Sequence, residues 1–261
     1  MIRVTVLGLG AAGLPVALAL QAGQVPGMML HSVAASTIGR AQAKLPDVSA
    51  HLAQDIDAMG DLVVECLPPA AFAAVVGPIV QSGRDVLVAS VGGLLNAPEV
   101  AAYAGQGRIF LPSGALGGLD GVRAIAASGN AQMRLASEKP VAGFEQSAYL
   151  TAKGIVLADL TTRTCLFSGP AREGVRLFPK NVNVVAALSL AGIGADDTQL
   201  ELWADPDATT NQHKVTAIGP AAHFEALTIN LPDPQNPRTS ALTGFSLIAA
   251  LRNIAAPIRF A

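Results

Sequence analysis

The chain has 261 residues, of which 51% are hydrophobic and only 14% are charged, against roughly 25% charged residues in an average soluble domain. This composition excludes a disordered chain, an acidic tail and a coiled coil. A formal net charge of -2 and the lack of any run of Lys or Arg argue against nucleic acid or a membrane surface as a partner.

The first 110 residues alternate apolar stretches typical of buried strands with stretches typical of helices. The expected strands are 2–7, 28–34, 61–67 and 85–90, and the expected helices are 14–21, 38–45 and 70–81. Strands that are apolar throughout and separated by helices indicate a parallel sheet covered on both faces. Right-handed crossovers make such a sheet doubly wound. We therefore predict an α/β fold that begins with a Rossmann domain over residues 1–112.

Residues 4–20 form an apolar run after Arg3 that superficially fits a signal peptide. Three glycines and a proline interrupt the run, whereas a secretory segment is usually about 7 to 15 residues of helix formers. We therefore interpret the run as a strand, a turn and a helix start, and we expect a soluble, cytoplasmic protein.

The second half contains alternating stretches at 132–136, 157–166, 198–204 and 221–231, which predict a half-buried, largely antiparallel sheet. Residues 182–190 are expected to be helical, 232–237 to form a turn, and 239–253 to form a helix. We predict a smaller α+β domain for catalysis and dimerisation over 113–238. The C-terminal segment 239–261 is expected to return to the Rossmann domain.

A glycine motif, Gly8-x-Gly10-x-x-Gly13, follows the first predicted strand and opens the first helix. Glycines at these positions let the chain turn tightly and let backbone N–H groups approach a pyrophosphate at the positive end of the helix. The context of the motif favours a dinucleotide site. The alternative is a tight strand-to-helix turn without a ligand.

A second feature is the lack of an acidic residue after this motif. An NAD site usually has Asp or Glu about 20 residues beyond the glycines, to bind the ribose 2′-hydroxyl, yet the first acidic residue of this chain is Asp47. Ser36 and Arg40 stand near the end of the second strand instead. We expect NADP to be accepted there, unless Arg40 merely lies on an exposed helix face.

The four histidines differ in their surroundings. His31 lies in an apolar strand and is expected in the core, and His51 lies in a polar stretch and is expected in solvent. His223 falls on an alternating stretch. His213, in Asn-Gln-His-Lys, is a candidate acid or base, although a lone histidine is more often structural. The spacing of His, Cys, Asp and Glu, including the two cysteines, predicts no metal site.

Six blocks resemble the L-aspartate dehydrogenase family over nearly the whole chain. They are Gly8-x-Gly10-x-x-Gly13, Glu65-Cys66-Leu67-Pro68, residues 112–120 (PSGALGGLD), residues 178–184 (FPKNVNV), Asn211-Gln212-His213 and Asn236-Pro237-Arg238-Thr239-Ser240. The PSGALGGLD and Asn-x-Asn-Val blocks are more specific than the glycine motif. The family's acidic ribose partner is variable, so the resemblance leaves NAD and NADP both open.

The resemblance implies roles for individual residues. His213 would be catalytic, and Ala115 and an asparagine of the Asn-x-Asn block would contact the cofactor, assigned to Asn183 with Asn181 as the alternative. Lys139 resembles a family Lys-Pro block and is a candidate for binding a substrate carboxylate, unless it is a solvated lysine at a strand end. Ser113 and Gly114 are also assigned to the substrate. The other assigned cofactor contacts are Gly8, Gly10, Ala11, Ala12, Gly13, Ser36, Arg40, Leu67, Pro68 and Ser90.

The family reaction oxidises L-aspartate to iminosuccinate, which hydrolyses to oxaloacetate and ammonia; it feeds NAD biosynthesis or aspartate metabolism. An imidazole with a pKa of about 6.5 suits the proton transfers of this reaction, and we expect a homodimer by analogy. One alternative is another two-domain reductase, of the homoserine or dihydrodipicolinate type. Another is a Rossmann protein that senses dinucleotides without catalysis.

Overall fold

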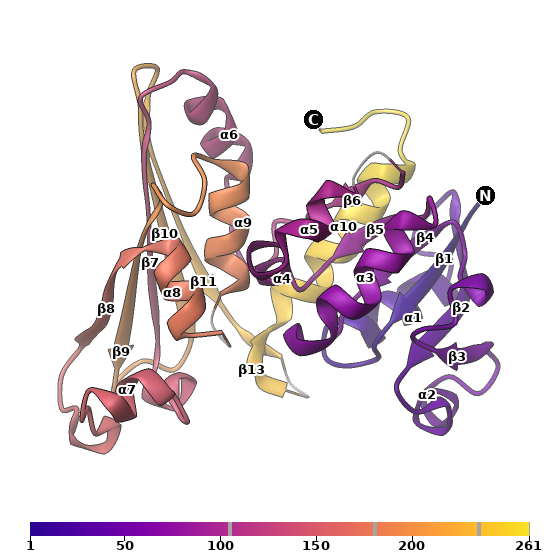
Figure 1. Cartoon of the computed structure of the whole chain (residues 1–261), viewed down its shortest axis with the longest axis horizontal. Helices are drawn as coiled ribbons and strands as arrows, with labels where there is room; N and C mark the ends of the chain where they lie inside the picture. The colour runs from indigo at the N-terminus through magenta and orange to yellow at the C-terminus, as the bar shows by residue number, and fades with distance from the viewer. Residues whose placement is uncertain (104–105, 180–181, 234–235, 261) are drawn as a thin grey trace. The chain divides into compact units, whose positions relative to one another are not determined.

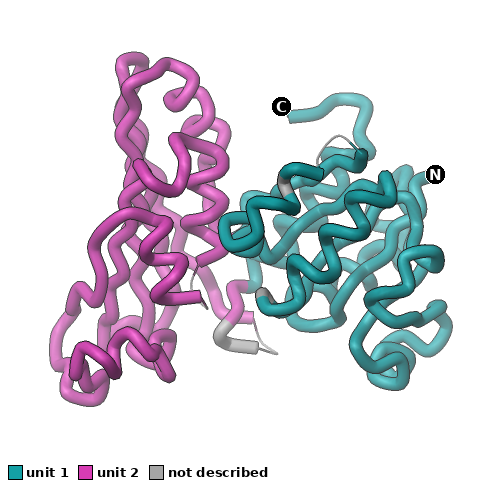
Figure 2. Tube along the Cα trace, viewed as in Figure 1, with its two compact units in different colours: residues 1–114, 241–261 teal, residues 115–240 magenta. Residues whose placement is uncertain are grey.

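The computed structural model describes residues 1–103, 106–179, 182–233 and 236–260 (Figure 1). The chain divides into two compact units (Figure 2): unit 1 comprises Met1–Gly114 and Ala241–Ala261, and unit 2 comprises Ala115–Ser240. The C-terminal segment therefore belongs to the same unit as the N-terminus.

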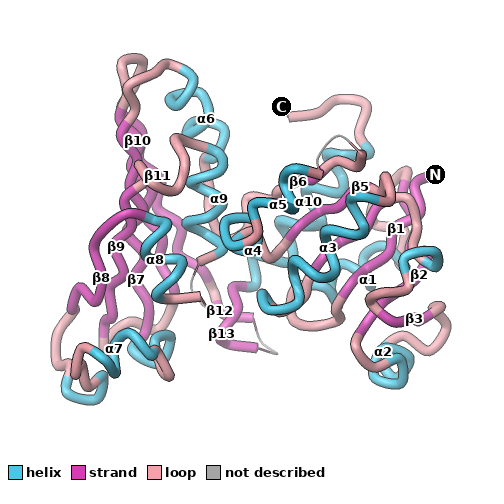
Figure 3. The backbone as a smooth tube through the Cα atoms, in the orientation of Figure 1, coloured by secondary structure: helices cyan, strands magenta, loops and turns pink. Residues whose placement is uncertain are grey.

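Unit 1 is built on a six-stranded sheet in the order β3-β2-β1-β4-β5-β6, in which every neighbouring pair is parallel (Figure 3). The strands are β1 (Ile2–Leu7), β2 (Met28–Ala35), β3 (Ala50–Leu52), β4 (Leu62–Glu65), β5 (Asp85–Val88) and β6 (Ile109–Phe110). Strand order reverses at β1, which creates the switch point where open α/β sheets bind ligands. The prediction of a doubly wound Rossmann sheet is confirmed.

Helices cover both faces of this sheet, so its strands contribute to two separate cores. On one face Val4 and Val6 of β1 pack with Val16 and Leu247, and on the other face Leu7 packs in a cluster that contains Phe72. The helices are α1 (Gly13–Gln21), α2 (Ile38–Lys44), α3 (Phe72–Gln81), α4 (Gly92–Asn96), α5 (Pro98–Ala102) and α10 (Ala241–Ala255), with the 3₁₀ turns η1 (Ile56–Ala58) and η2 (Pro69–Ala71). The helix α10 packs against α1.

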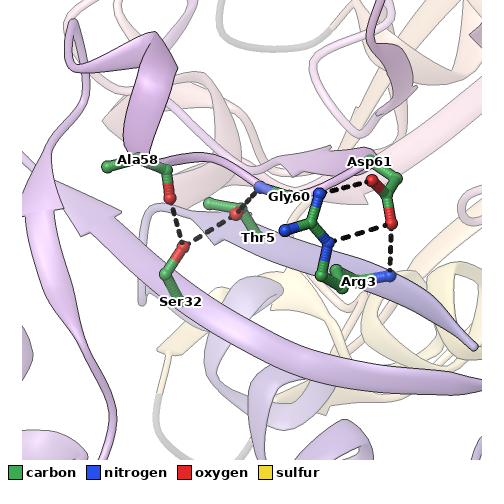
Figure 4. Close-up of polar contacts among 6 residues, drawn as sticks. All are labelled: Arg3, Thr5, Ser32, Ala58, Gly60 and Asp61. Atoms are coloured by element: carbon green, nitrogen blue, oxygen red, sulfur yellow. Dashed lines mark hydrogen bonds and ion pairs between the residues drawn. The ribbon is translucent and has the colours of Figure 1, made fainter.

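A polar network is enclosed among β1, β2 and β3 (Figure 4). The hydroxyls of Thr5 and Ser32 lie 2.8 Å apart, and the backbone N–H of Gly60 donates to Thr5 Oγ1 at 2.9 Å. Ser32 Oγ lies 3.1 Å from Nε2 of His51, which is only 8% exposed. The expectation of a solvated His51 is therefore wrong, because β3 brings it against β2. His31 is half-buried rather than in the core.

Unit 2 is built on a five-stranded sheet in the order β11-β10-β7-β9-β8. Its strands are β7 (Gln132–Pro140), β8 (Thr164–Pro170), β9 (Gln199–Asp205), β10 (Asn211–Ile218) and β11 (His223–Asn230). The β7–β9 pair is parallel and the other three pairs are antiparallel. The predicted second domain with a largely antiparallel sheet is confirmed.

The sheet of unit 2 has one buried and one exposed face. Along β7, Met133, Leu135 and Ser137 are buried, whereas Gln132 and Arg134, which alternate with them, are exposed. The helices of this unit are α6 (Leu119–Ala127), α7 (Ala148–Ala152), α8 (Ala171–Leu177) and α9 (Asn183–Ala191), with the 3₁₀ turns η3 (Val141–Phe144) and η4 (Leu157–Asp159). Of these, α6 contacts β10 and α8 contacts β8 and β9.

Two predicted segments of unit 2 differ in the structure. The stretch predicted as a strand over 157–166 begins with the 3₁₀ turn η4, and only its end belongs to β8. The predicted turn at 232–237 overlaps β12 (Pro232–Asp233) and the first residues of β13 (Asn236–Ser240), and these two strands pair in antiparallel fashion. Over the described ranges, no helix is long and apolar enough to cross a membrane.

Candidate active site

The glycine motif forms the turn between β1 and α1, and its three glycines have different structural roles. Gly8 has a φ of +87°, and a Cβ there would lie 2.5 Å from the carbonyl oxygen of Cys66. A Cβ on Gly13 would lie 1.9 Å from the carbonyl oxygen of Gly8. At Gly10 a Cβ would meet no atom within 4 Å.

The loop therefore fits a dinucleotide. Gly8 and Gly13 let the loop and the helix pack closely, while the exposed Gly10 leaves open space at the start of α1. Ala11 and Ala12 beside it are half-buried, with small side chains. An anion can approach the backbone N–H groups at this open start of the helix. Such N–H groups are the hydrogen-bond donors that bind a pyrophosphate.

The end of β2 carries hydroxyl and cationic groups. Ser36 follows β2 directly, and Arg40 stands in the first turn of α2; both are exposed. One turn further, Lys44 donates a hydrogen bond of 2.6 Å from Nζ to the carbonyl oxygen of Leu9 in the glycine loop. Sequence reasoning missed Lys44, although its spacing of four residues from Arg40 places both on one helix face.

The loops after β4 and β5 are joined by hydrogen bonds. Ser90 Oγ donates to the carbonyl oxygen of Leu67 at 2.7 Å. The backbone N–H groups of Leu67 and Ser90 both donate to the carboxylate of Glu65. Pro68, next to Leu67, is exposed. Glu65 enters the sequence analysis only as part of a block, yet a glutamate that ends an otherwise apolar strand is itself a signal of a special role.

His213 lies on the buried face of the sheet of unit 2. It pairs in register with Ser137 of β7, and its Nδ1 lies 3.0 Å from Ser137 Oγ. His213 is 3% exposed and Ser137 is fully buried. Lys139 stands two residues beyond Ser137 on the same strand, so both side chains leave the same face of the sheet.

The surroundings of His213 and Lys139 lower the pKa of both side chains. Burial, and to a lesser degree the ammonium of Lys139, lower the pKa of His213 to about 3. Burial lowers the pKa of Lys139 to about 8. The ordinary pKa of about 6.5 that the sequence suggests for the imidazole therefore does not hold for this buried ring, which is neutral throughout the physiological range.

The other candidate residues lie in both units. Ser113 and Gly114 end the first segment of unit 1, and Ala115 begins unit 2. The carbonyl oxygen of Ala115 accepts a hydrogen bond of 3.2 Å from Asn230 Nδ2, and Asn183 is the exposed first residue of α9. Asn181 lies outside the described residues. Across the described ranges, three or more His, Cys, Asp or Glu side chains nowhere gather in a group that could hold a metal ion.

Comparisons with known proteins match both halves of the chain. A family model of the aspartate dehydrogenase C-terminal domain matches residues 120–254, and one of the homoserine dehydrogenase NAD binding domain matches residues 8–107. L-aspartate dehydrogenase 3 of Bordetella bronchiseptica is 40% identical, over 98% of this chain and 96% of that protein. L-aspartate dehydrogenase of Bradyrhizobium diazoefficiens is 38% identical, over 96% of this chain and 91% of that protein.

A solved structure has the same fold over the full length. The crystal structure of aspartate dehydrogenase from Thermotoga maritima superposes with a TM-score of 0.73 and covers 100% of both chains, at 23% sequence identity. At that identity the likeness shows the fold alone. It matches the pairing of a Rossmann sheet with a second, mixed sheet.

Proposed function

This chain belongs to the L-aspartate dehydrogenase family, and we propose that it oxidises L-aspartate to iminosuccinate with NAD or NADP. Iminosuccinate then hydrolyses to oxaloacetate and ammonia, and the reverse reaction is a reductive amination. The observation that carries the proposal is the 40% identity to an L-aspartate dehydrogenase over 98% of the chain. In the oxidation, C2 of aspartate gives up a hydride and the amino nitrogen gives up a proton as the C=N bond forms.

Unit 1 is the proposed dinucleotide-binding unit. When bound, the nicotinamide accepts the hydride from the substrate. Backbone N–H groups of Gly10, Ala11 and Ala12 at the start of α1 would hold the pyrophosphate, because the glycine loop leaves this end of the helix open. The loops of Leu67, Pro68 and Ser90, with Ala115 and Asn183 or Asn181 from unit 2, are assigned to the remaining cofactor contacts.

We expect Arg40→Ala to raise the Kd for NADPH about tenfold while changing the Kd for NADH less than threefold. A guanidinium binds a 2′-phosphate by charge-assisted hydrogen bonds that a 2′-hydroxyl does not offer. Titration of cofactor fluorescence measures both values, and Arg84→Ala, at a half-buried arginine of the same unit outside the assigned site, is the control. Equal changes in the Kd values for NADPH and NADH would show that Arg40 does not bind the 2′-phosphate and only lies on the helix surface.

His213 is the proposed catalytic residue of unit 2. Its Nδ1 is engaged by Ser137, which leaves Nε2 as the ring nitrogen for the substrate. The neutral ring is able to accept the proton that leaves the substrate nitrogen or an attacking water. Binding of a dicarboxylate would offset the charge of Lys139, one of the two causes that lower the pKa of His213, and so raise its basicity.

Lys139 is the proposed partner of a substrate carboxylate, together with Ser113 and Gly114. We expect Lys139→Ala to raise KM for L-aspartate about tenfold or more, since a charge-assisted hydrogen bond is lost, without changing the Kd for NADPH. Because the ammonium loses its proton as the pH rises through a pKa of about 8, kcat/KM for aspartate should fall above that pH. Lys139→Arg, which keeps its charge, should remove this fall. An unchanged KM in Lys139→Ala would exclude the assignment.

We also propose that the protein is a cytoplasmic homodimer that pairs through the exposed face of the unit 2 sheet. Leu227 and Ile229 on β11 are 59% and 58% exposed, and Ile218 on β10 is 42% exposed. Exposed apolar side chains on a sheet face fit an interface with a second copy of the chain. Sedimentation equilibrium should give twice the chain mass, and Leu227→Asp should shift the protein toward monomer; a monomeric native protein would contradict the proposal. Recovery of the protein in the membrane fraction of lysed cells would contradict the cytoplasmic assignment.

The activity is tested by absorbance at 340 nm with L-aspartate and L-homoserine in parallel. The homoserine alternative has a match of the NAD binding domain over residues 8–107 in its favour. However, two relatives that match 98% and 96% of this chain are L-aspartate dehydrogenases. We expect reduction of NAD or NADP with aspartate only. Cofactor binding without turnover of either amino acid, or of oxaloacetate with ammonia, would favour a sensing protein instead.

A further inference from the structure

Glu65 is a fully buried carboxylate in the parallel sheet of unit 1 that the proposed reaction does not use. It is the last residue of β4 and pairs in register with Leu7 of β1 and Val88 of β5. Its exposed fraction is 0%. Burial raises the pKa of its carboxyl, while hydrogen bonds from backbone N–H groups act in the opposite direction. A buried carboxylate is unfavourable unless its oxygens accept hydrogen bonds. The groups that donate these hydrogen bonds therefore indicate what Glu65 does in the structure.

Each carboxylate oxygen of Glu65 binds a different loop. Oε1 accepts a hydrogen bond of 2.6 Å from the N–H of Leu67, in the loop after β4. Oε2 accepts one of 3.0 Å from the N–H of Ser90, in the loop after β5. The Ser90 hydroxyl donates to the carbonyl oxygen of Leu67 at 2.7 Å and closes the ring. The three bonds fix the two loops to each other and to the end of the sheet.

Only a carboxylate can make this arrangement. Two N–H donors converge on the side chain, and both of its terminal atoms must accept. Glutamine has the same shape, but its amide nitrogen would face a backbone N–H, so one loop would lose its bond and leave a buried donor unpaired. Aspartate keeps both oxygens but is one methylene shorter.

Both loops lie on one side of the glycine motif at the carboxyl edge of the sheet, the loop after β4 next to the motif and the loop after β5 one strand further. The carbonyl oxygen of Cys66, the residue after Glu65, lies 2.5 Å from the position that a Cβ on Gly8 would take. The loop after β4 therefore forms a wall of the glycine turn, and any shift of that loop moves the surface offered to a dinucleotide. We propose that Glu65 is a positioning residue for the dinucleotide, which holds the Leu67 and Ser90 loops in their binding shape. The inference rests on the proposed cofactor binding by unit 1.

Glu65→Gln tests the proposal in the full-length protein, with Glu99→Gln, an exposed glutamate on α5, as the matched control. Without cofactor, hydrogen–deuterium exchange at the amides of Leu67 and Ser90 should be at least about tenfold faster in Glu65→Gln than in the wild type or the control. The Kd for NADPH, from its fluorescence, should rise at least about tenfold. Glu65→Asp should give a smaller change in the same direction, and serves alone if Glu65→Gln does not fold.

The outcomes separate the two proposals. Wild-type exchange rates and an NADPH affinity within threefold of wild type, in a folded Glu65→Gln or Glu65→Asp protein, would overturn the role of Glu65 and leave the proposed function intact. Faster loop exchange without any loss of NADPH affinity would likewise overturn it, since the loops would then move without consequence for binding. A wild-type protein that binds neither NADPH nor NADH would overturn the proposed function and the role of Glu65 with it.

Discussion

Replacement of His213 by alanine should lower kcat for L-aspartate by a factor of about 10² to 10⁴, the usual effect of losing a group that transfers protons. The Kd for NADPH should stay within threefold of wild type, because the assigned pyrophosphate contacts come from the glycine loop of unit 1. Steady-state kinetics at saturating aspartate and a fluorescence titration measure the two quantities. The variant should therefore be impaired in the chemical step and not in the binding of the dinucleotide.

The control is His223→Ala. That histidine lies on β11 of the same sheet, but its side chain is 60% exposed, and we expect wild-type kinetics for the variant. Because His213 is buried, its removal also leaves a space, and the thermal midpoint of each variant shows whether the fold is retained. A folded His213→Ala protein with less than a tenfold loss of turnover would remove His213 from the catalytic role.

Gly13→Ala should abolish measurable NADPH binding and lower the thermal midpoint. The new Cβ would lie 1.9 Å from the carbonyl oxygen of Gly8. Because a Cβ is fixed to its own backbone and the oxygen is a backbone atom, the glycine turn and the first turn of α1 must separate. Overpacking of this kind destabilises a fold by about 1 to 3 kcal/mol or more. The same separation removes the backbone N–H groups from a pyrophosphate.

Gly10→Ala is the matched comparison, since a Cβ there meets no protein atom within 4 Å. We expect this variant to fold like the wild type and to bind NADPH at least about tenfold more weakly, because its methyl group would occupy the space proposed for the pyrophosphate. Differential scanning fluorimetry with and without NADPH distinguishes the two variants. Wild-type binding by both would show that the glycine loop is a turn without a ligand.

Much of unit 1 could be predicted from the sequence because its strands are buried on both faces. The β1 prediction agrees at both ends, and β2, β4 and β5 are found within a few residues of the expected ranges. The short strands β3 and β6 have three and two residues. They could not be predicted, because so few residues cannot show a periodic pattern of apolar side chains. Because β3 cannot be recognised in the sequence, the burial of His51 could not be predicted either.

In the candidate site, sequence patterns identify residue types but not their surroundings. The glycine motif and the blocks of the resemblance lead to Gly8, Gly10, Gly13 and His213. The bond between His213 and Ser137 depends on the register of β10 and β7, whose partners are 76 residues apart in the chain. The altered pKa values of His213 and Lys139 follow from burial by the folded unit, which the local sequence does not contain.

The most direct test of the central claim follows the transferred hydrogen. The enzyme is incubated with L-aspartate deuterated at C2 and with NADP, or NAD in parallel, and the reduced cofactor is examined by proton NMR. We expect deuterium at C4 of the nicotinamide, with oxaloacetate and ammonia formed in equal amounts. Reduced cofactor without deuterium, or no reduction of either cofactor, would contradict the assignment of this chain as an L-aspartate dehydrogenase.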